Sequence, residues 1–379
     1  MDSRRIRILL VEDDPDDVWV MRGLLGDRWD GPFELAQVEA LSAGIRRCQE
    51  EPFDIVLLDL SLPDSQGLET FLAMHAQAEG VPIVVLTGCD DESAAMRAVQ
   101  AGAEDYLVKG QVDDNVLVRS IRYAIERSRR HHAEEALRAT SEEFRLAGEI
   151  QRRLFPAEPP AVEGFDIAGA LYPAKATAGD YFDFIPMIDD CLGIVVGDVS
   201  SHGMGPALLM SETRACLRTL AQTHFDVGDI LTRTNRVLAA DTGDFHFVTL
   251  AMARLDPRER TLVYASAGQR GYLLEASGNL EILDSTSLPL GVSEQTVVPT
   301  APPRSLGQGD VVTFFTDGVI EAESPGKVRF GSERALDVIR AAKDEPARRI
   351  TQRLYEEICG FARHQPQGDD ITVVVVKAE

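Results

Sequence analysis

Cysteine is scarce in this sequence, and no two cysteines lie close together. Five occur among 379 residues, at Cys48, Cys89, Cys191, Cys216 and Cys359. Their scatter provides no closely spaced pair of ligands for a structural zinc site. We therefore interpret all five as reduced thiols, which favours a cytoplasmic protein over a disulfide-stabilised secreted one.

The sequence also lacks long hydrophobic runs and has a deficit of positive charge. No apolar run is long enough to span a bilayer, and Met1–Arg5 leads directly into an apolar segment, so we expect neither a membrane span nor a signal peptide. Lysine and arginine number 38 against 62 acidic residues, a formal net charge of −24. This argues against nucleic-acid binding. The length favours two domains and a connection.

Short apolar segments alternate with helical patterns in the first third of the chain. Polar residues follow four of these segments, namely Asp13 and Asp14, Asp59, Thr87 and Lys109. The alternation predicts a doubly wound α/β domain with a parallel sheet, in which ligands bind at the carboxyl ends of the strands. The segments expected to form strands are Ile6–Val11, Phe33–Val38, Asp54–Leu58, Ile83–Leu86 and Tyr106–Val108.

The five polar residues suggest a phosphoryl-transfer site. Three carboxylates at neighbouring strand ends would repel one another unless a divalent cation lay among them. Asp59 could then attack phosphorus, while Lys109 compensates the charge and Thr87 donates a hydrogen bond. The alternative is a set of polar strand ends that only face water. It is less favoured, because five suitable residues follow four strands.

Residues 5–122 resemble a response-regulator receiver domain of flavodoxin-like fold. The resemblance implies a Mg²⁺ ion and a sensor histidine kinase as the cognate partner. The family lysine is usually followed by a proline, and Gly110 stands there in this chain. The resemblance assigns the acidic, metal-binding pair to Asp13 and Asp14, the phospho-acceptor to Asp59, the switch hydroxyl to Thr87, the switch aromatic to Tyr106 and the lysine to Lys109.

A helical pattern continues beyond the receiver and contains a single glycine, Gly148, between Arg119 and Leu154. We predict a helical linker over residues 123–155. Apolar residues recur at steps of four and three, with Thr140 and Gln151 as polar intrusions. This weak heptad pattern favours a coiled coil with a second copy, and hence a homodimer. A solvated single helix is the alternative.

Four motifs follow the helix-breaking segment Pro156–Pro160. They contain Asp180, Asp198, Asp317 and Asp369, and three of these aspartates border apolar, strand-like segments. Alternating strands and separate helices predict an α+β domain over residues 156–379, with two packed sheets and helices outside. Carboxylates at strand ends could converge on divalent cations. Each aspartate taken alone could equally be a turn residue.

The ordered motifs GDYFDF, GDVSSHG, TDG and GDDITVVVV resemble those of the metal-dependent protein phosphatases of type 2C, in their bacterial sporulation and stress-sigma branch. The resemblance implies a β-sandwich with two Mn²⁺ or Mg²⁺ ions. Asp198 would bridge them, Asp180 and the Val199 carbonyl would complete one shell, and Asp317 and Asp369 would hold the other ion.

Two further residues of these motifs are candidates for catalysis. Asp370 could orient a water at the ions. Eukaryotic relatives carry a catalytic histidine two residues after the bridging aspartate, but Ser200 stands there and the histidine is His202. We consider His202 as a general acid, with a histidine bonded to the loop backbone as the alternative. Asp183 lies near the site in sequence, without an assigned role.

The two resemblances predict a cytoplasmic two-component response regulator with phosphatase output. The family implies as substrate a phosphorylated anti-sigma-factor antagonist of the STAS type. One alternative is a non-catalytic adaptor that binds a sigma-factor regulator. A DNA-binding output is a third hypothesis, but the sequence shows no helix-turn-helix pattern, and its negative charge is unfavourable for binding DNA.

Overall fold

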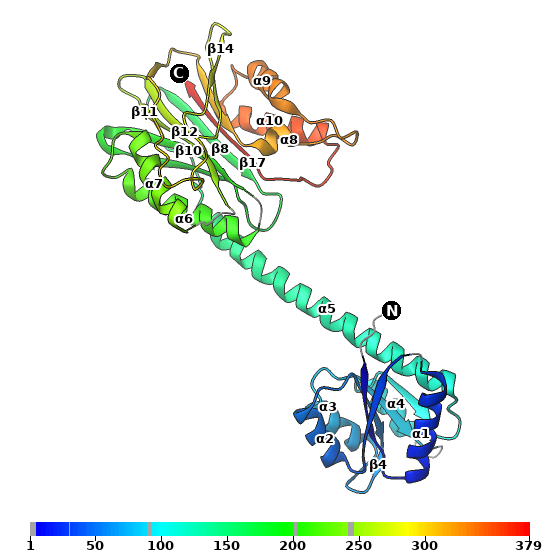
Figure 1. The fold of residues 1–379 in the computed structure, drawn as a ribbon. Helices are drawn as coiled ribbons and strands as arrows, with labels where there is room; N and C mark the ends of the chain where they lie inside the picture. The colour runs from blue at the N-terminus through cyan, green and yellow to red at the C-terminus, as the bar shows by residue number, and fades with distance from the viewer. Residues whose placement is uncertain (1–4, 30, 89–91, 201–202, 242–245) are drawn as a thin grey trace. The chain divides into compact units, whose positions relative to one another are not determined.

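The computed structural model describes residues 5–29, 31–88, 92–200, 203–241 and 246–379. The chain divides into two compact units, residues 1–140 and 141–379, each with its own core (Figure 1). The predicted boundaries at residues 122 and 155 stay predictions. No helix in the described ranges has the length and apolarity needed to cross a bilayer.

The first unit is built on a five-stranded sheet in the order β2-β1-β3-β6-β7, and every neighbouring pair is parallel. Helices pack on both faces, so the predicted doubly wound fold is confirmed. The strands are β1 (Ile6–Val11), β2 (Phe33–Val38), β3 (Ile55–Asp59), β4 (Ser61–Leu62), β5 (Ser65–Gln66), β6 (Ile83–Thr87) and β7 (Asp105–Val108), and the first four helices are α1 (Pro15–Arg28), α2 (Leu41–Glu50), α3 (Leu68–Gln77) and α4 (Glu92–Gln100).

Helix α5 (Asp114–Arg152) is one continuous helix of 39 residues. Its first turns bury Leu117, Ile121 and Ile125 against the receiver sheet. Farther along, Leu137 of the heptad pattern is 71% exposed. The predicted long linking helix is therefore confirmed, whereas its pairing with a second copy stays a prediction.

The second unit is a sandwich of two five-stranded antiparallel sheets, in the orders β15-β12-β11-β10-β9 and β14-β13-β16-β17-β8. The predicted sandwich flanked by helices is confirmed. The strands are β8 (Phe165–Tyr172), β9 (Tyr181–Pro186), β10 (Leu192–Val199), β11 (Val248–Asp256), β12 (Thr261–Ala267), β13 (Gly271–Leu274), β14 (Leu280–Leu283), β15 (Arg304–Ser305), β16 (Val311–Phe315) and β17 (Ile371–Ala378).

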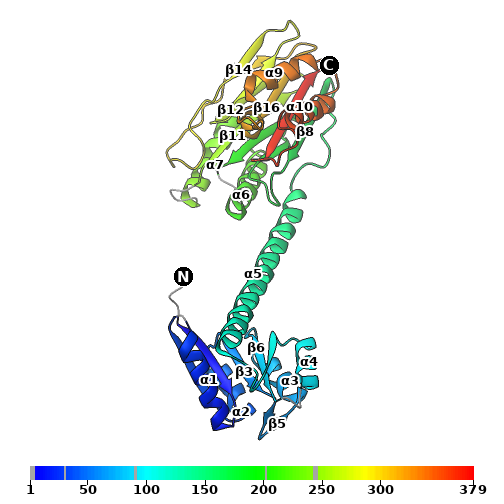
Figure 2. The ribbon, with the colours of Figure 1, turned by 90° about the vertical axis from the view of Figure 1, so that its right-hand side faces the viewer.

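Three hydrophobic layers hold the sandwich together. The inner layer lies between the sheets and includes Ile194, Val196 and Val374. One outer layer packs α6 (Met204–Leu220) and α7 (Val227–Asp241) on the sheet that contains β10. The other packs three helices on the sheet that contains β17, and two of them, α9 and α10, are seen in Figure 2. They are α8 (Asp317–Glu321), α9 (Gly331–Ala341) and α10 (Ala347–Phe361).

Strand β10 shows how the sequence builds these layers. Successive side chains of a strand point to opposite faces, so Ile194 and Val196 enter the inner layer while Val195 packs under the helices. At Gly197 there is no room for a side chain, because an added Cβ would lie 2.8 Å from the Thr249 carbonyl oxygen on β11. The two strands lie close together at this point, and the next residue, Asp198, is paired with Thr249 on β11.

Candidate functional site

The receiver unit gathers three acidic side chains at the carboxyl ends of β1 and β3. They are Glu12, Asp13 and Asp59, and one oxygen from each lies within 4.8 Å of the others. Asp59 is 4% exposed and Glu12 is fully buried. Carboxylate oxygens are the donors that Mg²⁺ prefers, so the three residues fit a divalent cation.

The predicted acidic pair is corrected by this geometry. Asp14 does not join the cluster; its side chain caps α1 by accepting a hydrogen bond of 2.8 Å from the Asp16 N–H. Glu12 takes its place because β1 ends at Val11, and the first residue after a parallel strand lies at the functional edge. The end of the apolar run at Val11 was the signal in the sequence.

Lys109 provides the positive charge of this site. Its Nζ lies 2.8 Å from Asp59, 2.6 Å from Glu12 and 2.9 Å from Asp17. Burial would lower the pKa of Lys109, but hydrogen bonds to Asp59, Glu12 and Asp17 outweigh it and raise the pKa overall. Burial raises the pKa of Glu12 to about 7 against the opposing effect of Lys109.

The predicted switch residues lie beside this cluster. Thr87, at the end of β6, is buried, and its hydroxyl donates to the Gly88 carbonyl at 3.2 Å. Tyr106 is half-buried and packs against the core that contains α3 and α4. Gly110 has φ +81°, which the ring of a proline does not allow. The switch roles of Thr87 and Tyr106 stay predictions.

The second unit brings its four predicted carboxylates to the same edge of the sandwich. Asp180 precedes β9 and Asp198 lies near the end of β10, whereas Asp317 follows β16 and Asp369 precedes β17. Burial, followed by the charges of Asp317 and Asp369, raises the pKa of Asp198 to about 8, and a hydrogen bond with Asp180 opposes this rise. Both sheets therefore contribute to one acidic site.

The spacing of these carboxylates differs from that in the receiver. Among the residues with described positions, the receiver cluster is the only acidic group of three whose oxygens lie within 4.8 Å of one another. The donor set of the second unit is all oxygen, with Asp180 buried, Asp198 half-buried, and Asp317 and Asp369 exposed. Carboxylate oxygens of this kind fit hard divalent cations. Its wider spacing suits a site for two ions better than a site for one.

Two threonine hydroxyls fix the orientation of Asp180. Thr316 and Thr372 donate to the same carboxylate oxygen, Oδ2, at 2.7 and 2.5 Å, and all three residues are at most 1% exposed. Thr316 directly precedes Asp317, and its hydroxyl also accepts a 3.1 Å bond from the Thr372 N–H. Three segments that carry predicted ligands are thereby tied together. Neither threonine was predicted as a site residue, although both lie within the motifs TDG and GDDITVVVV.

Asp370 holds a loop. One of its carboxylate oxygens accepts from the Ala174 N–H and the other from the Gly179 N–H, each at 2.7 Å. Burial raises the pKa of Asp370, and these backbone hydrogen bonds oppose the rise. The residue thus positions the segment that ends in Asp180. The predicted contact of Asp370 with a water stays a prediction.

The segment after Asp198 is described in part. Val199 is buried at the end of β10, and its carbonyl as a ligand stays a prediction. Ser200 extends the pairing with β11, because its hydroxyl and its N–H both bond the Phe247 backbone at 3.0 Å. His202, the predicted general acid, lies outside the described residues.

Asp183 is a structural anchor. It is fully buried, and Arg218 on α6 donates two hydrogen bonds to its two carboxylate oxygens, each at 2.6 Å. The Tyr181 hydroxyl donates a third at 2.7 Å. These contacts fasten α6 to β9 and leave Asp183 without a role as a metal ligand.

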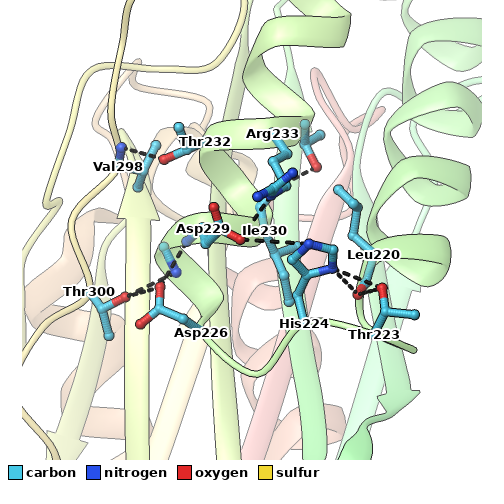
Figure 3. Close-up of polar contacts among 12 residues, drawn as sticks. Leu220, Thr223, His224, Asp226, Asp229, Ile230, Thr232, Arg233, Val298 and Thr300 are labelled. Carbon is cyan, nitrogen blue, oxygen red and sulfur yellow. Dashed lines mark hydrogen bonds and ion pairs between the residues drawn. The ribbon is translucent and has the colours of Figure 1, made fainter.

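The turn that follows α6 is also held by polar contacts (Figure 3). In the turn between α6 and α7, Asp226 accepts from the Thr300 hydroxyl at 2.8 Å, and the same hydroxyl accepts from the Gly228 N–H at 3.0 Å. The Thr232 hydroxyl on α7 accepts from the Val298 N–H at 2.9 Å. Together with the Arg218 pair, these contacts hold the end of α6 and the start of α7.

The end of α5 contacts the loop that carries Asp180. Gln151 is 6% exposed, and its side-chain amide forms two hydrogen bonds with the Ala178 backbone, at 2.7 and 2.9 Å. At Gly148 an added Cβ would lie 1.9 Å from the Ala176 carbonyl oxygen, so only glycine fits. This contact between α5 and the loop explains why the linker has a polar residue at Gln151 and its single glycine at Gly148.

Comparison with known families accounts for both units. The response regulator receiver domain matches residues 8–122, and Stage II sporulation protein E (SpoIIE) matches residues 188–379. The chain belongs to the SpoIIE family. In this SpoIIE-family chain a receiver domain is joined through α5 to a type 2C phosphatase domain.

Individual proteins also match this chain, at low sequence identity. Protein IcfG of Synechocystis sp. is 28% identical over 334 residues, which are 78% of this chain and 51% of IcfG. The chain thus spans about half the length of that relative. Phosphoserine phosphatase RsbU of Bacillus subtilis is 25% identical over 240 residues, 62% of this chain and 70% of RsbU. The SiaA-PP2C domain of Pseudomonas aeruginosa shares the fold, with a TM-score of 0.58, 20% identity and coverage of 64% of this chain and 99% of that domain.

Proposed function

We propose that this chain is a two-component response regulator whose output is a metal-dependent protein serine/threonine phosphatase. The observation that carries the proposal is the convergence of Asp180, Asp198, Asp317 and Asp369 from both sheets. Within the described ranges, none of these four forms an ion pair with a lysine or arginine. An acidic site that lacks its own cation is suited to divalent ions.

We assign the residues as follows. Asp198 would be shared by two Mn²⁺ or Mg²⁺ ions, with Asp180 and the Val199 carbonyl on one and Asp317 and Asp369 on the other. When bound, such ions activate water and neutralise charge on a phosphoryl group. The protein supplies the rigid frame, because the two threonine hydroxyls orient Asp180 and Asp370 holds its loop.

For the receiver we propose Asp59 as the phospho-acceptor, with a sensor histidine kinase as donor. Glu12, Asp13 and Asp59 would hold Mg²⁺, which would compensate charge on the incoming phosphoryl group. Lys109 already contacts Asp59, so its ammonium is in place to stabilise the acyl phosphate.

We further propose that phosphorylation changes how α5 pairs with a second copy, and that Gln151 passes this change to the Asp180 loop. The support is the direct contact of Gln151 with Ala178, two residues before Asp180. The substrate would be a phosphoserine protein, because the relative RsbU is named a phosphoserine phosphatase. The family resemblance favours an anti-sigma-factor antagonist of the STAS type.

The test is phosphate release from a phosphoserine protein by the full chain with Mn²⁺, with and without beryllofluoride as a phosphoryl mimic. Turnover that requires Mn²⁺ and changes with beryllofluoride supports the proposal. In Asp59→Asn, the beryllofluoride effect should vanish while Mn²⁺-dependent turnover persists. Partner binding without turnover would instead support the adaptor function.

A further inference from the structure

A cavity of about 580 Å³ adjoins the acidic site of the phosphatase domain. Asp369 lines it directly, as does Gly318, the neighbour of Asp317. Its walls come from α8, α10 and the segment 364–369. A group that enters this cavity would therefore lie next to a phosphoryl group held at the proposed ions.

The floor of the cavity is apolar and rigid. Ile358 and Ile371 line it and are each only 2% exposed. Tyr355 lines it as well, and its ring stacks on that of Tyr172 with centroids 3.5 Å apart. Gln367 donates to the Tyr172 and Asp369 carbonyls at 2.6 Å, which holds the neighbouring loop.

The charge of the rim selects against anions. None of the lining residues is lysine or arginine, whereas Glu321 and Glu323 both line the cavity. Glu321 is paired with Arg329 at 2.8 Å. Glu323 is exposed, and its carboxylate forms no ion pair with any residue that the structure describes. The cavity thus suits a cation better than a second phosphate.

We propose that this cavity receives a lysine or arginine side chain that neighbours the phosphoserine of the substrate. The aliphatic stem would lie over Ile358 and the Tyr355 ring, and the cationic head would meet Glu323 at the rim. The inference rests on the proposed function and deepens it. It narrows the substrate class to phosphoserine segments with a basic flank.

The test uses two synthetic phosphoserine peptides that differ only in carrying arginine or glutamate beside the phosphoserine. With the full chain and Mn²⁺, kcat/KM should be about tenfold higher for the arginine peptide, equivalent to roughly 1.4 kcal/mol. Glu323→Lys should abolish or reverse this ratio. The matched control is Glu333→Lys on α9, which is exposed and does not line the cavity, and it should keep the ratio.

A binding measurement separates the cavity from catalysis. Fluorescence anisotropy on Asp198→Asn reports affinity for both peptides without turnover. A preference for the arginine peptide that Glu323→Lys removes supports the cavity assignment, even if the wild type proves catalytically inactive and the proposed phosphatase activity fails. Equal affinity for both peptides, or a preference that persists in Glu323→Lys, overturns the cavity assignment even if phosphatase activity is present.

Discussion

The two acidic sites of this chain solve the same electrostatic problem in different ways. In the receiver, clustered carboxylates are compensated by Lys109, which contacts Glu12, Asp17 and Asp59. In the phosphatase domain the described residues offer no such cation, and Asp180 is held by neutral hydroxyls. Both arrangements pack carboxylates at sheet edges, but among the described residues a counter-charge within the cluster is seen only in the receiver, at Lys109.

The two sites therefore differ in their need for a bound cation. A lysine within a carboxylate cluster lowers the repulsion among the carboxylates, so the receiver site is less dependent on a bound ion. The phosphatase carboxylates repel one another unless they are protonated or bound to cations, and burial increases that cost. We therefore expect stronger metal dependence in the second domain than in the first.

The largest expected effect follows from removal of the shared carboxylate. Asp198→Ala should reduce phosphate release to background and weaken Mn²⁺ binding measured by isothermal titration calorimetry, because both proposed ions lose a ligand. Asp284→Ala removes an exposed carboxylate that pairs with Arg270, and it should leave both readouts unchanged. Wild-type turnover and Mn²⁺ affinity in Asp198→Ala would contradict the site.

A smaller loss of Mn²⁺ affinity is expected when one of the hydroxyls that orient Asp180 is removed. Thr372→Val removes one donor at nearly constant volume and should weaken Mn²⁺ affinity about 10- to 100-fold. Thr372→Ser keeps the hydroxyl and should restore most of that affinity. If the serine variant binds Mn²⁺ as poorly as the valine variant, packing of the threonine methyl rather than the hydrogen bond is responsible.

A residue's position can be predicted from the sequence when the residue adjoins a regular element, but not when its side chain can bond to several nearby partners. Asp59 and Asp198 could be placed because apolar strands end beside them. Asp14 was predicted as a ligand in place of Glu12. The correct choice depends on the exact residue at which β1 ends and on the use of the Asp14 side chain to cap α1. Gln151 resembled a coiled-coil defect because its partner, the Ala178 backbone, lies in a distant loop.

When the metal is removed, the stability of the phosphatase domain should depend on pH, because its carboxylates then have no bound cation. Burial and nearby carboxylates raise the pKa of Asp198 to about 8. Between its unfolded pKa and about 8, the folded ion-free state retains a proton that the unfolded state has released, so stability falls as pH rises. A cation replaces that proton.

Mn²⁺ should therefore raise the melting temperature of the phosphatase unit by several degrees more at about pH 8 than at about pH 5.5. Differential scanning calorimetry with and without EDTA measures this. In EDTA, the melting temperature of Asp198→Asn, in which this group cannot titrate, should vary less with pH than that of the wild type. An equal Mn²⁺ effect at both pH values would show that carboxylate repulsion does not limit the ion-free domain.

The smallest expected effect concerns the connection between the two sites. Gln151→Leu leaves the buried N–H and carbonyl of Ala178 unpaired, which should cost about 1–3 kcal/mol of local stability. Because this contact lies between α5 and the Asp180 loop, the variant should keep Mn²⁺-dependent turnover within a few-fold and lose most of its response to beryllofluoride. Arg138→Gln, an exposed change on the same helix, should preserve that response. If Gln151→Leu responds fully to beryllofluoride, the signal must reach Asp180 by a route that does not use the contact between Gln151 and Ala178.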